Sequence, residues 1–106
     1  MRKAQVFYHN ILAGTIWETE DGYSFQYNES YLKNEKSEPV SLTLPLQKEP
    51  YKSPVLFSFF DGLIPEGWLL EIAVTNWKLN PRDRFGLLLT MCSDCIGCIS
   101  LRSENH

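Results

Sequence analysis

Between a strand-like half of the chain and a helix-like half lies the stretch Phe59-Phe60-Asp61-Gly62-Leu63-Ile64-Pro65-Glu66-Gly67-Trp68. Pro65 suits the first position of a helix, where its missing N–H would be unpaired in any case. Glu66 would lie near the positive end of the helix dipole. Glycine costs a helix about 1 kcal/mol relative to alanine. The place of Gly67 beside Trp68 therefore indicates the close approach of another backbone or of a ligand, or a tight packing point.

The residues before this stretch predict an antiparallel sheet. Short apolar runs at Gln5–Tyr8 and Ile11–Glu18 are separated by a His9-Asn10 turn. After the hairpin signal Asp21-Gly22, aromatic residues alternate with polar ones from Tyr23 to Tyr27. This alternation predicts a strand with one aromatic face.

Three features of this half of the chain depart from regular strands. Gly14, inside the second predicted strand, indicates a bulge or a close contact. Leu42, Leu44 and Leu46 alternate with polar residues, but Pro45 favours an edge strand or an extended segment. The segment 47–54 holds two prolines and is expected to be irregular.

The second half of the chain predicts three short helices and a final strand. The helices are expected from Ser53-Pro54 to about Asp61, from Pro65 to about Leu79, and from Asn80-Pro81 to about Met91. Asn80 is the predicted N-cap of the third helix. The closing strand is expected at Ile96–Leu101. The sequence thus predicts one small α+β domain over residues 1–106, with its core from about 5 to 101 and an antiparallel β-meander before the helices.

Trp68 is the best candidate for an exposed anchor residue. At about 100° per residue, the apolar side of the second predicted helix centres near Leu69, Ala73 and Trp77. Trp68 projects roughly 140° away from that centre. The alternative is that Trp68 folds back onto the phenylalanines at 57, 59 and 60. The predicted partner-binding residues are Trp68, Glu66, Gly67, Pro65, Ile72 and Asp61.

Charge and hydropathy exclude several classes of partner. The net charge is −3 and no Lys/Arg cluster occurs, so direct binding of nucleic acid is not expected. The N-terminus lacks the apolar region of a signal peptide. No apolar run approaches the roughly 20 residues that cross a membrane. We therefore expect a cytoplasmic protein that does not bind a membrane.

No sequence motif indicates catalysis. The chain has no phosphate-binding P-loop, no kinase catalytic-loop signature, no serine-nucleophile elbow and no zinc-protease motif. Asp61 and Glu66 are separated by a glycine–proline turn, and nothing pairs them as general acid and base. We expect a protein that is not an enzyme and has no cofactor.

Cys92, Cys95 and Cys98 lie close together, which invites a metal or iron–sulfur interpretation. Such sites generally need four ligands, and His9 and His106 are the available histidines. Small reduced thiols also pack as apolar groups. The expectation is that no metal binds, with a small metal or redox protein as the alternative.

Several segments together resemble the N-terminal subdomain of HipA-type serine/threonine kinases, the toxins of bacterial toxin–antitoxin systems. The resemblance covers about residues 6–100 and is carried by Val6–Asn10, Tyr23–Tyr27, Ser41–Leu46, Phe59–Gly67 and Asp94–Gly97. The chain departs from the family at His9-Asn10, where Asn-Gly is usual, and at Cys92 and Cys98, where small residues are usual. The ATP-binding and catalytic core of these kinases has no counterpart in the chain.

The resemblance implies a function. In size and in lacking a fused kinase the chain is similar to HipS, the small antitoxin of tripartite systems. It implies an antitoxin that binds and neutralises a separate HipA-like kinase toxin, whose relatives phosphorylate aminoacyl-tRNA synthetases. A DNA-binding HipB-like protein is a further candidate partner in the same complex. Trp68 would then obstruct the active cleft of the kinase.

One rival interpretation keeps the same partner with the opposite effect: a detached N-terminal module that completes or activates the kinase. Another is a fragment of a full-length kinase, although the polar ending Arg102–His106 is typical of a natural terminus.

Overall fold

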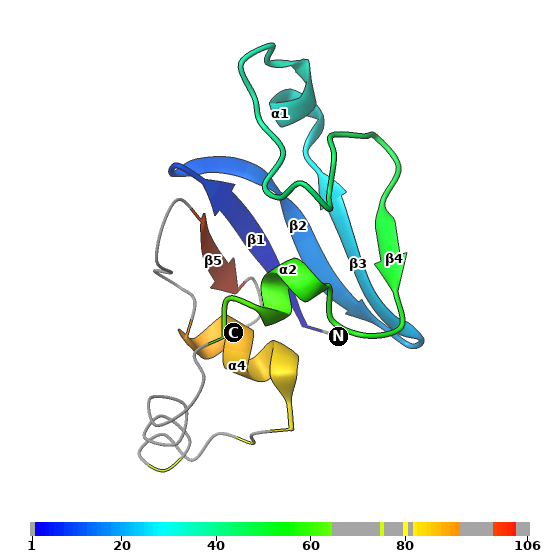
Figure 1. Cartoon of the computed structure of the whole chain (residues 1–106), viewed down its shortest axis with the longest axis vertical. Helices are drawn as coiled ribbons and strands as arrows, with labels where there is room; N and C mark the ends of the chain where they lie inside the picture. The colour runs from blue at the N-terminus through cyan, green and yellow to red at the C-terminus, as the bar shows by residue number, and fades with distance from the viewer. Residues whose placement is uncertain (1, 65–74, 76–79, 81, 92–98, 104–106) are drawn as a thin grey trace.

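A computed structural model describes residues 2–64, 75, 80, 82–91 and 99–103. Within these residues, one antiparallel sheet contains all the strands in the order β4-β3-β2-β1-β5 (Figure 1). The strands are β1 (Lys3–Tyr8), β2 (Ile11–Thr19), β3 (Gly22–Tyr27), β4 (Tyr51–Ser53) and β5 (Ile99–Ser103). The predicted α+β fold with an N-terminal β-meander is thus confirmed, and the closing strand lies beside β1.

The β1–β2 hairpin turns through His9 and Asn10, which have positive φ angles of 52° and 66°. Tyr8 and Ile11 pair directly across this turn. Two central residues with positive φ are the mark of a type I′ turn, which favours asparagine and glycine. The turn is therefore built without the glycine that would adopt this conformation most easily.

A bulge interrupts the pairing of β1 with β2. Val6 pairs with Gly14, whereas the next residue, Phe7, pairs with Leu12. A β-carbon on Gly14 would lie 2.3 Å from the backbone oxygen of Gln26 on β3. Gly14 therefore allows β2 and β3 to approach closely, as its place in the strand predicted.

Two tyrosines hold the long connection from β3 to β4. The Tyr27 hydroxyl donates to the Leu44 carbonyl and accepts from the Val40 N–H, 3.0 Å away. Tyr31, on α1 (Glu29–Lys33), donates to the Glu38 carbonyl at 2.5 Å. These bonds satisfy backbone groups that lie outside helices and strands.

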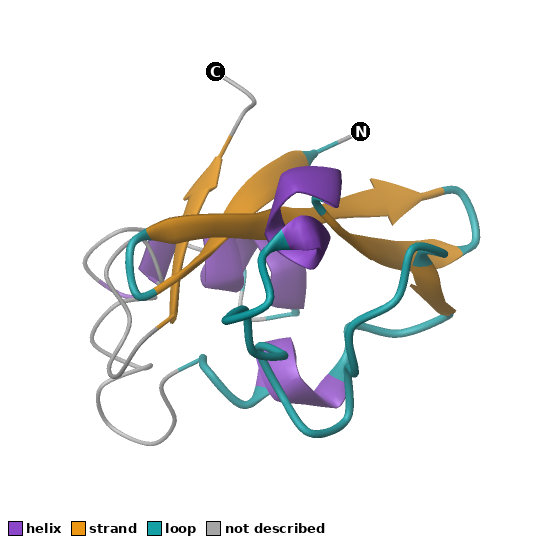
Figure 2. Cartoon of the chain, turned by 90° about the horizontal axis from the view of Figure 1, so that it is seen from above, coloured by secondary structure: helices purple, strands orange, loops and turns teal. Residues whose placement is uncertain are grey.

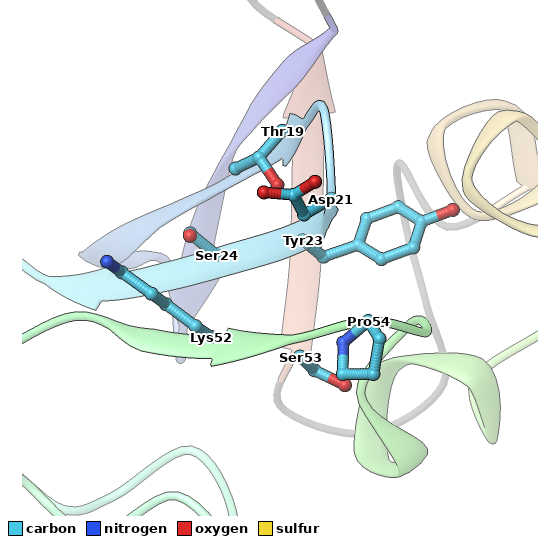
Figure 3. A pocket seen from close by; sticks show the side chains of 7 residues that line it. All are labelled: Thr19, Asp21, Tyr23, Ser24, Lys52, Ser53 and Pro54. Atoms are coloured by element: carbon cyan, nitrogen blue, oxygen red, sulfur yellow. The ribbon is translucent and has the colours of Figure 1, made fainter.

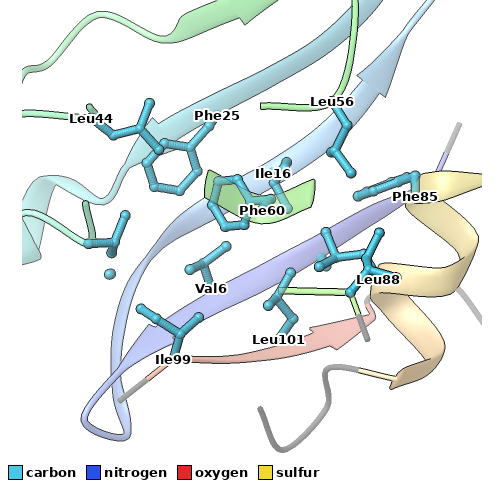
Figure 4. Packing of buried hydrophobic residues seen from close by; sticks show 14 of the residues in the cluster. Val6, Ile16, Phe25, Leu44, Leu56, Phe60, Phe85, Leu88, Ile99 and Leu101 are labelled. Atoms are coloured by element: carbon cyan, nitrogen blue, oxygen red, sulfur yellow. The ribbon is translucent and has the colours of Figure 1, made fainter. Parts of the chain in front are cut away.

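The core lies between the sheet and two helices, α2 (Ser58–Asp61) and α4 (Arg84–Met91), which pack on the same face (Figures 1 and 2). Phe60 from α2 and Phe85 from α4 are fully buried, as are Ile16 and Phe25 from the sheet (Figure 4). The largest fully buried side chains are Phe25, Phe60, Phe85, Ile16, Leu87, Leu88, Leu101 and Val6.

Two helix starts differ from the prediction. The helix α2 begins at Ser58 rather than at Ser53-Pro54, because residues 51–53 pair with β3 as β4 instead of being irregular. The helix α4 begins at Arg84, because the carboxylate of Asp83 accepts the Gly86 N–H at 3.1 Å and caps the first turn. The predicted cap, Asn80, instead accepts the Arg82 N–H at 3.0 Å in a local turn.

The leucine-rich segment also differs from the prediction. Instead of an extended run, Ser41–Leu44 closes a tight turn, with the Leu44 N–H bonded to the Ser41 carbonyl at 3.1 Å. Leu44 is buried, whereas Leu42 is 95% exposed. The α1 helix was not predicted, and β5 ends at Ser103 rather than Leu101. The predicted helix 65–79 and the cysteine turn lie outside the described residues.

Candidate partner-binding site

Of the predicted partner-binding residues, the structure describes Asp61, at the end of α2. Its side chain is 41% exposed, so it lies at the surface. Pro65, Glu66, Gly67, Trp68 and Ile72 lie outside the described residues. Their role in binding stays a prediction, and the described residues 57–64 form the base that precedes them in the chain.

Aromatic packing fixes this base. Phe60 is fully buried, with its ring centroid 5.4 Å from that of Phe25 on β3. Phe57 and Phe59 both pack edge-on against Phe60, at 6.3 Å and 5.2 Å between centroids. Ile64 is 2% exposed, and its N–H bonds to the Asp61 carbonyl at 3.2 Å. The stretch 57–64 is thus packed onto the sheet.

An ion pair joins the two sides of the segment 62–83. The Arg84 Nε donates to the Asp61 Oδ1 at 2.6 Å, which links the last residue of α2 to the first residue of α4. Both side chains are partly exposed, at 34% for Arg84 and 41% for Asp61. A cation of a binding partner would therefore have to share the Asp61 carboxylate with Arg84.

A second ionic cluster lies beside the first. The Arg2 guanidinium donates to both carboxylate oxygens of Asp83, at 2.7 and 2.8 Å, and also to both oxygens of Glu18 on β2. Its central carbon lies 5.5 Å from the centre of the Phe85 ring. A β-carbon on Gly86 would lie 2.3 Å from the Asp83 carboxylate, so this glycine leaves the space that the cluster occupies. The cluster fastens the start of α4 to the sheet.

The hydrogen bonds within this cluster shift the pKa values of its three side chains. Hydrogen bonds from Arg2 hold the pKa of Glu18 and the pKa of Asp83 below their ordinary values. The hydrogen bonds that Arg2 donates to Asp83 and Glu18 raise the pKa of Arg2 above its ordinary value. All three groups are therefore charged at neutral pH.

A shallow hollow of 600 Å³ lies next to Asp61 and Arg84. Val55, on its rim, is 68% exposed and supplies an apolar contact. The hollow combines both signs of charge with apolar surface, which suits a side chain of a protein partner. Its lining consists of Tyr23, Pro54, Val55, Leu56, Ser58, Asp61, Gly62 and Arg84.

Sequence patterns did not indicate Arg84, Arg2 or Asp83 as neighbours of the site. Arg2 and Asp83 are 81 residues apart, and their pairing follows from the position of α4 on the sheet. The described part of the chain contains no group of three or more His, Cys, Asp or Glu residues that could hold a metal ion. The three cysteines lie outside it.

No helix within the described ranges is long and apolar enough to cross a membrane.

Comparisons with known proteins assign the domain to a family. A family model described as the HipA N-terminal domain matches residues 4–102. An uncharacterised protein of Haemophilus influenzae is 30% identical over 106 residues, covering all of this chain and 96% of that protein. A candidate kinase of Sinorhizobium fredii, Y4mE, is 27% identical over 107 residues, and the chain spans only 26% of its length.

The fold comparison agrees with the sequence comparisons. A solved structure titled as the N-terminal domain of HipA toxin matches with a TM-score of 0.74 and 28% identity. The match covers 99% of this chain and 94% of that one. The similarity therefore extends over the whole architecture.

Proposed function

Because this chain belongs to the HipA N-terminal domain family, we propose that it binds a separately encoded HipA-like serine/threonine kinase and neutralises it as an antitoxin. One observation carries the proposal. The chain matches a HipA N-terminal domain over 99% of its length, and it also covers 96% of the uncharacterised Haemophilus influenzae protein, a relative that is about as long as this domain alone. A domain that packs on a kinase within one polypeptide can bind the same kinase surface as a separate chain.

The family relationship is also consistent with a protein that is not an enzyme. The N-terminal subdomain of HipA proteins is not their catalytic domain. The proposed activity is therefore inhibition through protein–protein contact in the cytoplasm, with no cofactor. A HipB-like DNA-binding protein is the proposed third member of the complex.

The proposed binding surface is Trp68 with Pro65, Glu66, Gly67 and Ile72, next to Asp61. Its support is the firm base on either side: α2 is packed through Phe60, and Arg84 pairs with Asp61 at 2.6 Å. A segment whose flanking residues are held in a packed structure loses less conformational entropy on binding than a free peptide does. In this mechanism Trp68 enters the active cleft of the kinase and obstructs it.

A growth assay tests the function. The kinase encoded beside this chain is expressed alone, with the wild-type chain, or with a Trp68→Ala variant. An antitoxin restores growth, whereas a module that completes or activates the kinase deepens the arrest. Deeper arrest would therefore replace the proposed function by the rival one.

A binding measurement tests the surface. Truncating a buried interface tryptophan costs about 2 kcal/mol or more, so Trp68→Ala should weaken kinase binding about thirtyfold. Leu42→Ala is the control, because Leu42 is an apolar side chain that is 95% exposed in the turn between α1 and β4. If Trp68→Ala binds and suppresses the kinase as well as the wild type does, the proposed role of Trp68 is wrong, whatever the growth assay shows.

Asp61 calls for a separate comparison, because it contacts Arg84. If Asp61 touches the kinase directly, Asp61→Asn should weaken binding more than Arg84→Met does. Equal losses would mean that the ion pair only positions the neighbouring segment. Circular dichroism of both variants checks that each remains folded.

A further inference from the structure

The outer face of the sheet, opposite α2 and α4, carries an ordered array of cationic and aromatic side chains. Residues that pair directly across antiparallel strands point to the same face. The register therefore places one row across four strands: Lys3, Trp17, Ser24 and Lys52. A second row, from β5 to β3, is Arg102, Gln5, Thr15 and Gln26.

Burial confirms that this face differs from the core face. Lys3, Gln26, Lys52 and Arg102 are exposed, whereas Ala4, Val6 and Ile16 at the alternate positions are fully buried. Ser24 is an exception, since it is 2% exposed while it faces outward. Its row neighbours are the larger residues Trp17 and Lys52.

The charged residues of the two outer rows are all cations. The two outer rows contain three cations, Lys3, Lys52 and Arg102, and no carboxylate, although the whole chain has a net charge of −3. Glu18, on the same strand as Trp17, alternates to the other face and bonds to Arg2. The nearby acidic residues Glu20 and Asp21 belong to the hairpin turn at the end of the face.

Aromatic groups lie between and beside these cations. Trp17 is partly exposed and falls between Lys3 and Lys52 in the register. The Arg102 guanidinium lies 5.0 Å from the centre of the Phe7 ring. Lys52 and Ser24 come from neighbouring strands and line a shallow pocket of 390 Å³ that reaches Thr19 and Asp21 (Figure 3). The face thus offers cations for carboxylates and flat apolar surface for hydrophobic side chains.

We propose that this outer face binds an acidic segment of a protein, in which aromatic or aliphatic residues alternate with carboxylates. Lys3 and Lys52 are three strand spacings apart, or about 14 Å. An extended peptide covers that distance in about four residues, so carboxylates at that interval reach both lysines. Hydrophobic residues between them would pack on Trp17, and Arg102 can bind a carboxylate through two hydrogen bonds.

A protein segment fits this face better than a nucleic acid does. Binding a phosphate backbone draws its strength from many cations, and nucleic-acid-binding domains are typically basic overall. Here three cations stand on a chain of net charge −3. This number suffices for a short acidic peptide with apolar contacts.

The inference is independent of the proposed kinase surface. Asp61 and Arg84 belong to α2 and α4, which cover the opposite face of the sheet. One complex could therefore engage both surfaces at once. Failure of either proposal leaves the other intact, because the two are tested with different variants and different ligands.

Nuclear magnetic resonance of the full chain, labelled with nitrogen-15, tests the proposal. The probe is a synthetic peptide that repeats Glu-Asp-Phe-Gly, with its Gln-Asn-Phe-Gly counterpart and oligouridylate RNA as comparisons. We expect saturable shifts confined to outer-face signals, including the Trp17 indole N–H, with the acidic peptide alone. Added salt should weaken them, because exposed charges are screened.

Charge-reversal variants test whether the outer-face cations bind the acidic peptide. Lys52→Glu with Arg102→Glu should weaken binding of the acidic peptide at least about tenfold. Lys33→Glu with Lys36→Glu changes the net charge equally but at exposed positions in and after α1, and should leave the affinity unchanged. Equal binding of the uncharged peptide, binding of RNA instead, shifts elsewhere, or no saturable shift would each overturn the proposal. If the double variant fails to fold, Lys52→Glu alone supplies the comparison.

Discussion

Arg2 and Asp83 form a two-point ion pair, with Nη1 to Oδ2 at 2.7 Å and Nη2 to Oδ1 at 2.8 Å. The pair joins the residue before β1 to the residue that caps α4. Because Arg2 also binds Glu18, a single guanidinium holds a strand, a helix start and the chain's first residues together. The segment proposed to bind the kinase, residues 65–72, lies in the sequence between α2 and Asp83.

Removing the Arg2 side-chain charge should destabilise the domain. Arg2→Met leaves two carboxylates without their partner, and we expect a loss of about 1–2 kcal/mol in the free energy of unfolding. In a domain of this size that loss lowers the Tm by roughly 4–15 °C. Arg82→Met is the control, because Arg82 is exposed and its change should stay within about 0.5 kcal/mol. Equal Tm values for both variants would mean that the clamp contributes no stability.

The same cluster should make the domain sensitive to acid. The pKa values of Glu18 and Asp83 are lowered in the folded state, so the unfolded chain takes up protons first as the pH falls. The contribution of the cluster is therefore complete above about pH 5 and is lost as the pH falls through about 4 towards the lowered values. Urea unfolding at several pH values should show the difference in stability between wild type and Arg2→Met shrinking as the pH falls below about 4. A constant difference between them would contradict this linkage.

Tyr27 should be needed for the β3–β4 connection. Tyr27→Phe leaves the buried Leu44 carbonyl and the Val40 N–H without their partner, which should cost about 1–3 kcal/mol. Tyr51→Phe, which removes an exposed hydroxyl bonded to the Pro45 carbonyl at 2.6 Å, should cost much less. Chemical denaturation of both variants provides the comparison, and similar losses would argue against the buried network.

The hydroxyl of Tyr27 should also give an alkaline limit to stability. Burial raises the pKa of Tyr27 to about 12. Between the ordinary value of about 10 and this value, the unfolded chain loses the proton first, so stability falls as the pH rises. Tyr27→Phe should therefore show a flatter stability profile from pH 10 to pH 12, measured by urea unfolding. An unchanged slope would assign the alkaline loss to other groups.

An Asn-Gly sequence in the β1–β2 turn should make the domain more stable. Both His9 and Asn10 have positive φ angles, which glycine adopts without steric cost. Replacing His9-Asn10 by Asn-Gly should stabilise the domain by about 0.5–1 kcal/mol, visible as a Tm increase of a few degrees. Glycine also gains entropy in the unfolded state, so a lower Tm would mean that this gain outweighs the relieved strain.

Gly14 should tolerate no side chain. In Gly14→Ala the new methyl group would meet the Gln26 carbonyl oxygen at 2.3 Å, and both groups belong to paired backbone that cannot move away freely. We expect a loss of about 2 kcal/mol or more. Gly62→Ala is the control, because Gly62 has helical φ and ψ angles and the nearest atom to its new methyl would be 3.3 Å away. If both variants unfold at the same temperature, the close approach of β2 and β3 is not rigid.

Local sequence determined the regular parts of this domain. The meander follows from period-two alternation at Tyr23–Tyr27 and from the Asp21-Gly22 turn, both of which act between residues close in the chain. The close contact at Gly14 and the end of α4 at Met91 could be read in the same way. The family resemblance rested on short motifs, and the match over residues 4–102 confirms it.

Only the tertiary structure decided which distant groups meet. The start of α4 depends on Asp83 rather than Asn80, because the Asp83 carboxylate both caps the helix and meets Arg2, 81 residues away. The Asp61–Arg84 pair and the rows of the outer face likewise arise from helix packing and strand register, which local propensity does not encode. The exposure of Leu42, at 95%, has the same kind of cause. The Tyr27 hydroxyl donates a hydrogen bond to the Leu44 carbonyl, and this long-range bond holds Ser41–Leu44 in a tight turn instead of an extended segment.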